Sequence, residues 1–159
     1  MKQYIYLDDV RTPTQGVGED NQPWVVVRSY DEFVEKVNEI GLENIQSISL
    51  DHDLGDSAVS EWKNNVYHNY KLDYDNITEK TGYDCAKWLV DLVQANPKLV
   101  IKSCSVHSHN PVGANNIHSF INGFKKHMGW AEDCYIGKHP FTVENKYNDH
   151  KYYKRKFCK

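Results

Sequence analysis

The segment IQSISLDHD, residues 45–53, joins a short apolar run to three ionisable side chains. An apolar run of this length, bounded by polar residues, is typical of a buried strand. The same change from apolar to polar residues occurs in YIYLDD (residues 4–9) and in LVIKSCSVHSHN (residues 99–110), and WVVV (residues 24–27) is a further β-branched run. We therefore predict four buried strands, three of which end at Leu7, Leu50 and Val106.

Helical periodicity separates these strands. Apolar residues recur at helical spacing over residues 33–40, 85–93 and 117–124, and each segment follows residues that can cap a helix. The caps are Ser29, which forms a capping box with Glu32, then Thr81, and then Asn110, which Pro111 follows at the first helical position. Strands that alternate with helices predict an α/β protein with a doubly wound, mainly parallel sheet and helices on both of its faces.

The chain has 159 residues, which is the usual size of one domain with its own core. We therefore predict a single domain over residues 1–159, with a final edge strand at residues 134–136. Residues 56–80 are polar and lack a clean period, which is typical of a surface insertion or a mobile flap. Residues 146–159 form a basic tail that is rich in lysine and tyrosine.

The composition excludes several classes of function. With 40% apolar and 26% charged residues, the chain is expected to be globular rather than disordered or membrane-embedded, and no apolar run approaches the ~18 residues of a membrane span. The net charge of -3 argues against a binder of duplex DNA, whose affinity comes from neutralising phosphates. The four cysteines form no C-x-x-C pair, so we expect reduced thiols in a cytoplasm rather than a zinc site or disulfides.

Several polar residues directly follow the predicted strands. In a parallel sheet with right-handed crossovers, the carboxyl ends of the strands lie at one edge, and ligands bind beyond that edge. We therefore expect these residues to meet in one pocket. They are Asp8, Asp9, Asp51, His52, Asp53, His107, Ser108 and Asn110.

The four acidic residues of this group would repel one another unless something neutralises them. A divalent cation such as Mg²⁺ or Mn²⁺ is the simplest solution, because hard cations prefer oxygen ligands, and we assign Asp8, Asp9 and Asp53 to it. Two alternatives stay open. Arg11 can neutralise part of the cluster without a metal, and some of the aspartates can be turn residues or helix caps.

His52 and His107 are the candidate proton carriers, and Asp51 joins them as a catalytic candidate. Histidine titrates near neutral pH, so two histidines can divide the base and acid roles of a phosphoryl displacement. The alternative is that one or both histidines are structural. His109 can share the site if its segment is extended, or it can face the solvent.

The start of the helix near residue 111 offers a place for a phosphate. The free amides and the partial positive charge of a helix start suit an anion, and Ser108, Asn110 and Gly113 lie there. The alternative is a well-capped helix that binds nothing. The basic tail at residues 146–159 can likewise contact a nucleic acid or nucleotide, or it can be a solvated terminus.

Four motifs, in order along the chain, resemble one family. LDDVRTP (7–13), SLDHDLG (49–55), TGYD (81–84) and VHSHNPVG (106–113) are similar to the cyclic-phosphate-processing receiver-like domain of bacteria and phages. The resemblance implies a receiver-like, flavodoxin-like fold and a role in processing cyclic phosphates on RNA ends or nucleotides. It implies functional roles for Asp8, Asp9, Arg11, Asp51, His52, Asp53, His107, Ser108 and Asn110, whereas His109 falls at a variable position.

The residues and the resemblance together predict a phosphodiesterase-like hydrolase that opens a cyclic phosphate on a nucleotide or an RNA end, in RNA repair or in phage–host conflict. Arg11, Ser108, Asn110 and Gly113 would bind the phosphate. Two alternatives are a non-catalytic protein that sequesters a cyclic nucleotide, and a receiver that accepts a phosphoryl group on Asp51. We expect neither duplex DNA nor a membrane as a partner, and a cytoplasmic location, that of the host cell if a phage encodes the chain.

Overall fold

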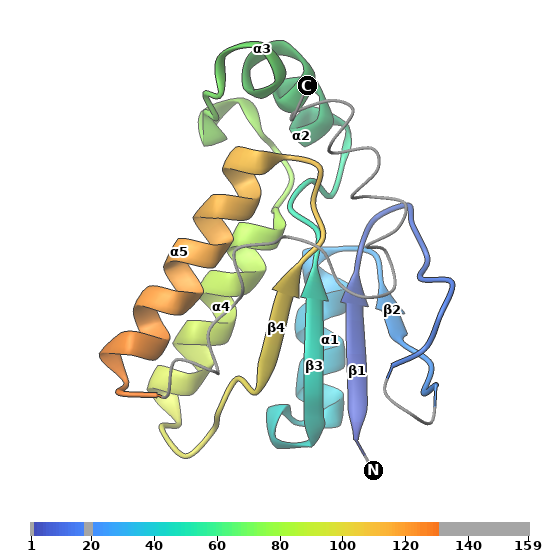
Figure 1. Ribbon diagram of the computed structural model, residues 1–159, viewed down its shortest axis with the longest axis vertical. Helices are drawn as coiled ribbons and strands as arrows, with labels where there is room; N and C mark the ends of the chain where they lie inside the picture. Colours follow the sequence, from blue (N-terminus) through green and yellow to red (C-terminus); the bar gives the residue numbers. More distant parts are fainter. Residues whose placement is uncertain (1, 18–20, 131–159) are drawn as a thin grey trace.

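The structure is a computed structural model that describes residues 2–17 and 21–130. Its centre is a sheet of four parallel strands in the order β2-β1-β3-β4, which confirms the predicted α/β class (Figure 1). β4 is shorter than the predicted strand because it pairs only with residues 47–50, and residues 96–99 form a turn before it. The strands are β1 (Gln3–Leu7), β2 (Val25–Val27), β3 (Ile45–Leu50) and β4 (Ser103–Val106).

The three long helices begin at the predicted caps. Thr81 and Asp84 form a complete capping box. The Ser29 hydroxyl accepts a hydrogen bond from the amide of Glu32 at 3.2 Å, but the Glu32 carboxylate accepts from the amide of Arg28, at 2.8 Å, so the capping box predicted there is only half formed. The helices are α1 (Tyr30–Ile40), α4 (Gly82–Ala95) and α5 (Pro111–His127).

The hydrophobic core lies between one face of the sheet and the long helices. Alternate residues of each strand point into it, as the period of two along a strand requires. α5 packs on α4 and extends the same core. The buried side chains include Ile5, Leu7, Ile48, Leu50 and Val106 from the strands, Phe33 and Val37 from α1, Leu89 and Val93 from α4, and Ile117 and Ile121 from α5.

The three long helices cover one side of the sheet. α1 lies behind the strands in Figure 1 and contacts α4, because the β2–β3 and β3–β4 connections cross the sheet in the same direction and right-handed crossovers put both helices on one face. The β1–β2 connection runs the other way, but its described residues form a loop rather than a helix. In the described part of the chain, the side chains that point to the opposite face include Tyr6, Ser49 and Ser105, which are neighbours in register.

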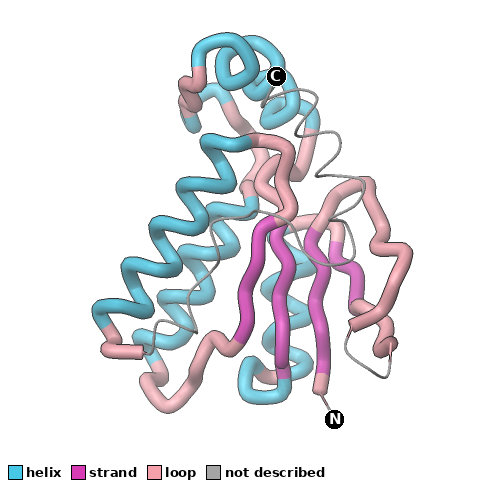
Figure 2. The backbone as a smooth tube through the Cα atoms, in the orientation of Figure 1, coloured by secondary structure: helices cyan, strands magenta, loops and turns pink. Residues whose placement is uncertain are grey.

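Residues 56–80 are largely helical, whereas their sequence suggested an irregular insertion. They lie beyond the carboxyl ends of the strands (Figure 2). Residues 56–69 are helical without a break, and a π-helical turn within them interrupts the 3.6-residue period by which a helix is recognised. The segment contains α2 (Asp56–Glu61), the π-helical turn η2 (Trp62–Val66), α3 (Tyr67–Asn69) and the 3₁₀ turn η3 (Tyr74–Asn76).

Two predicted features lie outside the described residues, namely the edge strand at 134–136 and the basic tail at 146–159. Among the helices in residues 2–17 and 21–130, none is both long and apolar enough to cross a membrane.

Candidate active site

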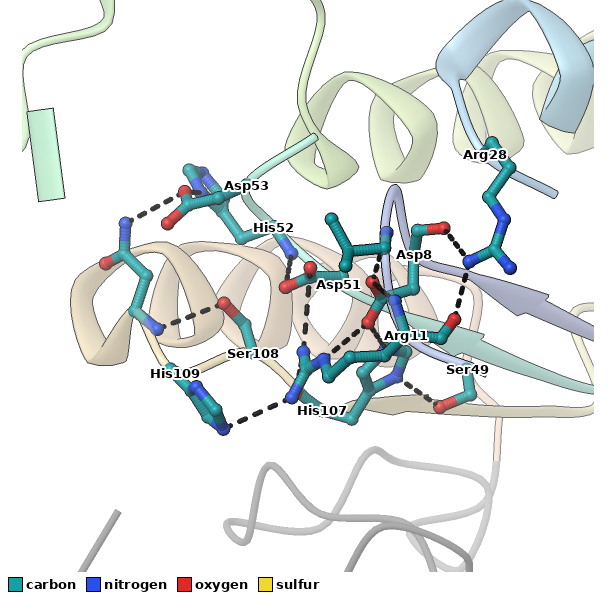
Figure 3. A network of polar contacts seen from close by, with 12 residues as sticks. Asp8, Arg11, Arg28, Ser49, Asp51, His52, Asp53, His107, Ser108 and His109 are labelled. Carbon is teal, nitrogen blue, oxygen red and sulfur yellow. Dashed lines mark hydrogen bonds and ion pairs between the residues drawn. The ribbon is translucent and has the colours of Figure 1, made fainter. Parts of the chain in front are cut away.

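Three strand ends bring the predicted polar residues together. The parallel hydrogen-bond pattern continues one residue past each strand: the amide of Asp8 donates to the carbonyl of Val27 at 3.1 Å, and that of Asp51 to the carbonyl of Leu7 at 2.9 Å. The amide of His107 donates in the same way to the carbonyl of Leu50, at 2.9 Å. The expectation that these segments meet at one edge of the sheet is therefore confirmed (Figure 3).

A cavity of about 260 Å³ opens at this edge. Its polar side comes from the strand ends and the loop after β1, and its apolar side includes residues of α2 and η2. The lining residues are Asp8, Asp9, Val10, Arg11, Asp51, Asp53, Val59, Trp62, Ser108 and His109.

Asp8 is buried, and its two carboxylate oxygens accept four hydrogen bonds. Oδ1 accepts from the amides of Val10 and Arg11, at 2.9 and 2.7 Å. Oδ2 accepts from Nε of Arg11 at 2.7 Å and from Nε2 of His107 at 3.1 Å. Burial by itself raises the pKa of Asp8, but the His107 hydrogen bond and the Arg11 charge outweigh it and hold the pKa well below its usual value. Asp8 is therefore ionised at neutral pH.

Arg11 connects the three polar segments. Besides its ion pair with Asp8, its Nη2 donates to the carbonyl of His107 at 3.0 Å and lies 3.6 Å from Oδ2 of Asp51. Its Nη1 lies 3.1 Å from Nε2 of His109. Arg28 holds the loop in place, because its Nη1 donates to the carbonyls of Asp8 and Arg11. The guanidinium is thus fixed at the cavity.

His107 is fully buried, with both ring nitrogens engaged. Nε2 faces the ionised carboxylate of Asp8, which can only accept, so Nε2 carries a proton. Nδ1 lies 2.7 Å from the hydroxyl of Ser49, and the ring stacks on Tyr6 at 4.2 Å between centroids. The ring has no exposed surface, and its Nε2 contacts the Asp8 carboxylate, which lines the cavity.

His52 is also fully buried. Its Nδ1 lies 2.6 Å from Oδ1 of Asp53, and its Nε2 lies 3.0 Å from the hydroxyl of Tyr74. Asn116 donates to the same hydroxyl, so the Tyr74 proton is free to go to Nε2 of His52. Burial raises the pKa of Tyr74 to about 12, which keeps the phenol protonated. Of the three predicted histidines, His109 is the one that lines the cavity.

Asp51 lies at the floor of the cavity. Its Oδ1 accepts a hydrogen bond from the amide of His52 at 2.8 Å. Burial raises the pKa of Asp51 well above its usual value, the charges of Asp8 and Asp53 raise it further, and Arg11 opposes the shift. Burial and the charge of Asp8 also raise the pKa of Asp9. Burial and the neighbouring carboxylates therefore both disfavour a negative charge on Asp51 and Asp9.

The residues predicted to hold a phosphate divide into two groups. Arg11 and Ser108 line the cavity. Asn110 caps α5 by accepting from the amide of Gly113 at 2.9 Å, and it donates to Asp53 at 3.2 Å. A Cβ on Gly113 would lie 2.3 Å from Cγ of His52, so this glycine makes room for the imidazole.

Gly82 has a similar role in the TGYD motif. Its amide donates to the carbonyl of His52 at 2.9 Å, and a Cβ there would lie 1.8 Å from the carbonyl oxygen of Asp51. The start of α4 therefore packs directly on the backbone that carries the two side chains.

The acidic residues could hold a divalent cation. Asp8, Asp9 and Asp51 each offer an oxygen within 4.8 Å of the others, and such a donor set fits a hard cation. The set contains Asp51 where we had assigned Asp53, because Asp53 is bound to His52 and Asn110. The oxygens of Asp8 already accept four hydrogen bonds, so Asp9 and Asp51 would supply most of the coordination.

Four residues that shape the site carried no functional prediction from the sequence, namely Val59, Trp62, Tyr74 and Ser49. An isolated tryptophan in a polar stretch was the available indication for Trp62. The alternation of serine with apolar residues in β3 was the indication for Ser49, because it puts the hydroxyl on the face opposite the core.

The fold and the cavity together define an α/β protein of the receiver-like class, with an acidic, arginine-containing cavity at the carboxyl ends of its sheet. Residues 3–123 match the family described as the cyclic-phosphate processing receiver domain, and the chain belongs to this family. The match includes every lining residue of the cavity. A search of curated proteins and a search of solved structures found no match. The chain is thus a receiver-like domain linked to cyclic-phosphate processing.

Proposed function

We propose that the protein is a hydrolase that opens a cyclic phosphate on a nucleotide or an RNA end. The observation that carries this proposal is the presence of Arg11, His109 and Asp51 in one cavity. A fixed guanidinium is suited to a phosphate. An imidazole and a carboxyl group with a raised pKa are suited to exchange protons with the reacting oxygens.

His109 is proposed as the base. An arginine nitrogen can only donate, so Nε2 of His109 is the acceptor in its contact with Nη1 of Arg11. A phosphate that binds Arg11 would compete for Nη1 and release this lone pair. Nε2 can then accept a proton from an attacking water.

The proton balance assigns the acid role to Asp51. The water oxygen forms a bond to phosphorus, its proton goes to His109, and one phosphorus–oxygen ester bond breaks. The leaving ribose oxygen keeps the electron pair and takes the proton of the Asp51 carboxyl group. Solvent then returns the proton from His109 to Asp51, so the enzyme is restored.

The two buried histidines act differently in this scheme. His107 is a positioning residue, because it orients Asp8, and Asp8 holds Nε of Arg11. His52 holds Asp53 and contacts Tyr74, which ties the strand end to residues 56–80. A divalent cation held by Asp8, Asp9 and Asp51 would polarise a phosphoryl oxygen, but it would need Asp51 ionised, so the acid role of Asp51 belongs to the metal-free site.

The test is incubation with 2′,3′-cyclic AMP and with an RNA that ends in a 2′,3′-cyclic phosphate, each with Mg²⁺, Mn²⁺ or EDTA. After denaturation, the products are separated and identified. We expect a ring-opened monophosphate, and a rate at least ~100-fold lower in His109→Gln and in Asp51→Asn, the scale of general acid–base catalysis. His127→Gln, an exposed histidine at the end of α5, is the matched control and should keep the full rate.

Two results would overturn the proposal. Recovery of the intact cyclic compound, bound but unchanged, would mean that the protein sequesters its ligand. Acid-labile phosphate on Asp51 after treatment with a small phosphodonor, without ring opening, would mean that it works as a phosphoacceptor.

A further inference from the structure

The cavity has an apolar wall that the chemistry of phosphate does not require. Val59 and Trp62 both line it, opposite the polar strand ends that carry Arg11. They are three positions apart where α2 continues into η2, so both side chains project from the same side of the helical segment. A π-helical turn inside a helix is often found at a functional site.

Buried residues and hydrogen bonds of the surrounding segment support the apolar wall formed by Val59 and Trp62. Ala58 and Val66, which flank it in the chain, have no exposed surface. The carboxylate of Glu61, itself 4% exposed, accepts hydrogen bonds from the side chains of Asn65 and Asn76, at 2.7 and 2.9 Å. These contacts tie η2 to η3, and the hydroxyl of Tyr74 in η3 lies 3.0 Å from Nε2 of His52, just after β3, so the wall is connected to a strand end.

Trp62 contacts the ring of Tyr67 and also lines the cavity. The edge of its ring meets Tyr67, with 5.8 Å between centroids and 62° between planes. The ring is half-buried rather than enclosed. An aromatic ring that packs on a neighbouring ring and also lines a cavity provides a surface on which a second planar ring can stack.

We propose that Trp62 stacks on the base of the ligand while Arg11 holds its cyclic phosphate, so that the ligand is a nucleoside cyclic phosphate rather than a base-free sugar phosphate. This inference rests on the proposed function. The cavity volume of about 260 Å³ lies just under the ~300 Å³ at which pockets for drug-sized ligands begin, which suits one nucleotide.

The chemistry of the apolar wall also predicts how strongly the site distinguishes one base from another. Val59 has no polar side-chain atom and the indole Nε1 of Trp62 is buried, so neither can read the edge of a base, whereas every base has a face that can stack. We therefore expect purine and pyrimidine nucleotides to bind alike within about tenfold, with the larger purine ring system ahead.

The experiment compares ligands with and without a base. The probes are 2′,3′-cyclic AMP, an RNA that ends in a 2′,3′-cyclic phosphate, and methyl riboside 2,3-cyclic phosphate, which lacks a base. Dissociation constants are measured by calorimetry, and ring opening is followed in parallel. The variants are Trp62→Leu, which keeps an apolar side chain without a stacking face, and Trp62→Phe, which keeps a smaller one. Trp130→Leu, beyond α5 and outside the cavity lining, is the matched control.

Loss of a base–aromatic stack, worth ~1–3 kcal/mol, corresponds to a loss of affinity of roughly 5- to 150-fold. We expect that loss for 2′,3′-cyclic AMP in Trp62→Leu, a smaller one in Trp62→Phe, and no change for the base-free probe or in Trp130→Leu. The mononucleotide and RNA arms show which source of the nucleotide binds better.

The inference is overturned if the wild-type protein binds the base-free probe as tightly as 2′,3′-cyclic AMP, or if Trp62→Leu, folded by circular dichroism, keeps its affinity for the nucleotide. It is also overturned if no probe binds. Base-dependent binding without ring opening would support the stacking site and refute the hydrolase. Ring opening at the same rate with and without a base would support the hydrolase and refute the stacking site.

Discussion

Oδ2 of Asp8 and Nε2 of His107, which are 99 positions apart in the chain, lie 3.1 Å from each other inside the protein. The contact is the middle of a chain of three polar contacts. The hydroxyl of Ser49 contacts Nδ1 of His107, Nε2 of His107 contacts Asp8, and Asp8 forms an ion pair with Arg11. A charged hydrogen bond of this kind, away from water, is worth ~1.5–3 kcal/mol. It therefore contributes to stability and to the position of the guanidinium together.

The depressed pKa of Asp8 predicts acid sensitivity. A carboxyl group whose folded pKa is below its unfolded value stabilises the fold above the unfolded pKa, about 3.9, and this contribution is lost as pH falls below that value. Thermal unfolding between pH 7 and pH 2.5 should show the wild-type Tm falling below about pH 4. Asp8→Asn should have a lower Tm at pH 7 and a weaker dependence on pH. Equal slopes would contradict the assigned ion pair.

The positioning role of His107 predicts a specific kinetic effect. His107→Gln keeps one donor for Asp8 but loses the stack on Tyr6, so Arg11 should be less well held. We expect KM for 2′,3′-cyclic AMP to rise by roughly tenfold, with a smaller change in kcat. A loss confined to kcat, on the ~100-fold scale of His109→Gln, would instead make His107 the proton carrier.

His118 should make the protein more stable above pH 6.5 than at pH 4. Burial lowers its pKa to about 4, and no described group bonds its Nε2. Between pH 6.5 and about 4 the unfolded chain binds a proton that the folded protein does not, so stability falls as pH is lowered through this range. His118→Leu should reduce the fall in Tm measured across it. His127→Leu, an exposed matched change, should leave the wild-type slope.

Three glycine-to-alanine variants should change the free energy of unfolding in different directions. In Gly113→Ala the new methyl group would overlap the His52 ring, and in Gly82→Ala it would overlap the carbonyl of Asp51, so both should lose at least ~1–3 kcal/mol of unfolding free energy. Gly123→Ala, also within α5, meets nothing within 4 Å and should gain ~0.5–1 kcal/mol, because alanine favours helix. Urea unfolding measures all three. A neutral Gly113→Ala would mean that His52 is not packed on α5.

Glu61 should hold residues 56–80 together. Glu61→Ala leaves the donors of Asn65 and Asn76 without their carboxylate, and we expect a loss of ~1–3 kcal/mol. Amide hydrogen exchange should become faster in residues 56–76 and stay unchanged in α1. Glu35→Ala, an exposed glutamate of α1, is the control. Unchanged exchange in residues 56–76 would show that burial of Ala58 and Val66 is sufficient.

The short polar helices mark the limit of prediction from pattern. The long helices were predictable because their apolar residues repeat and Ser29, Thr81 and Asn110 cap them. Residues 56–80 were not, since their order depends on side-chain contacts such as those of Glu61. The half-formed capping box at Ser29 has the same origin, because the Glu32 carboxylate accepts a hydrogen bond from the amide of Arg28 instead of that of Ser29.

The sequence by itself determined that Asp8, Asp51 and His107 meet, because each directly follows a buried run, and parallel strands leave their carboxyl ends at one edge. Only the tertiary structure decided which imidazole faces the cavity. His52 is packed against Tyr74 and Gly113 and His107 against Ser49, all from other elements, while His109 lies beside Arg11. The physical reason is that strand order follows from local pattern and handedness, whereas the direction of a side chain follows from the packing around it.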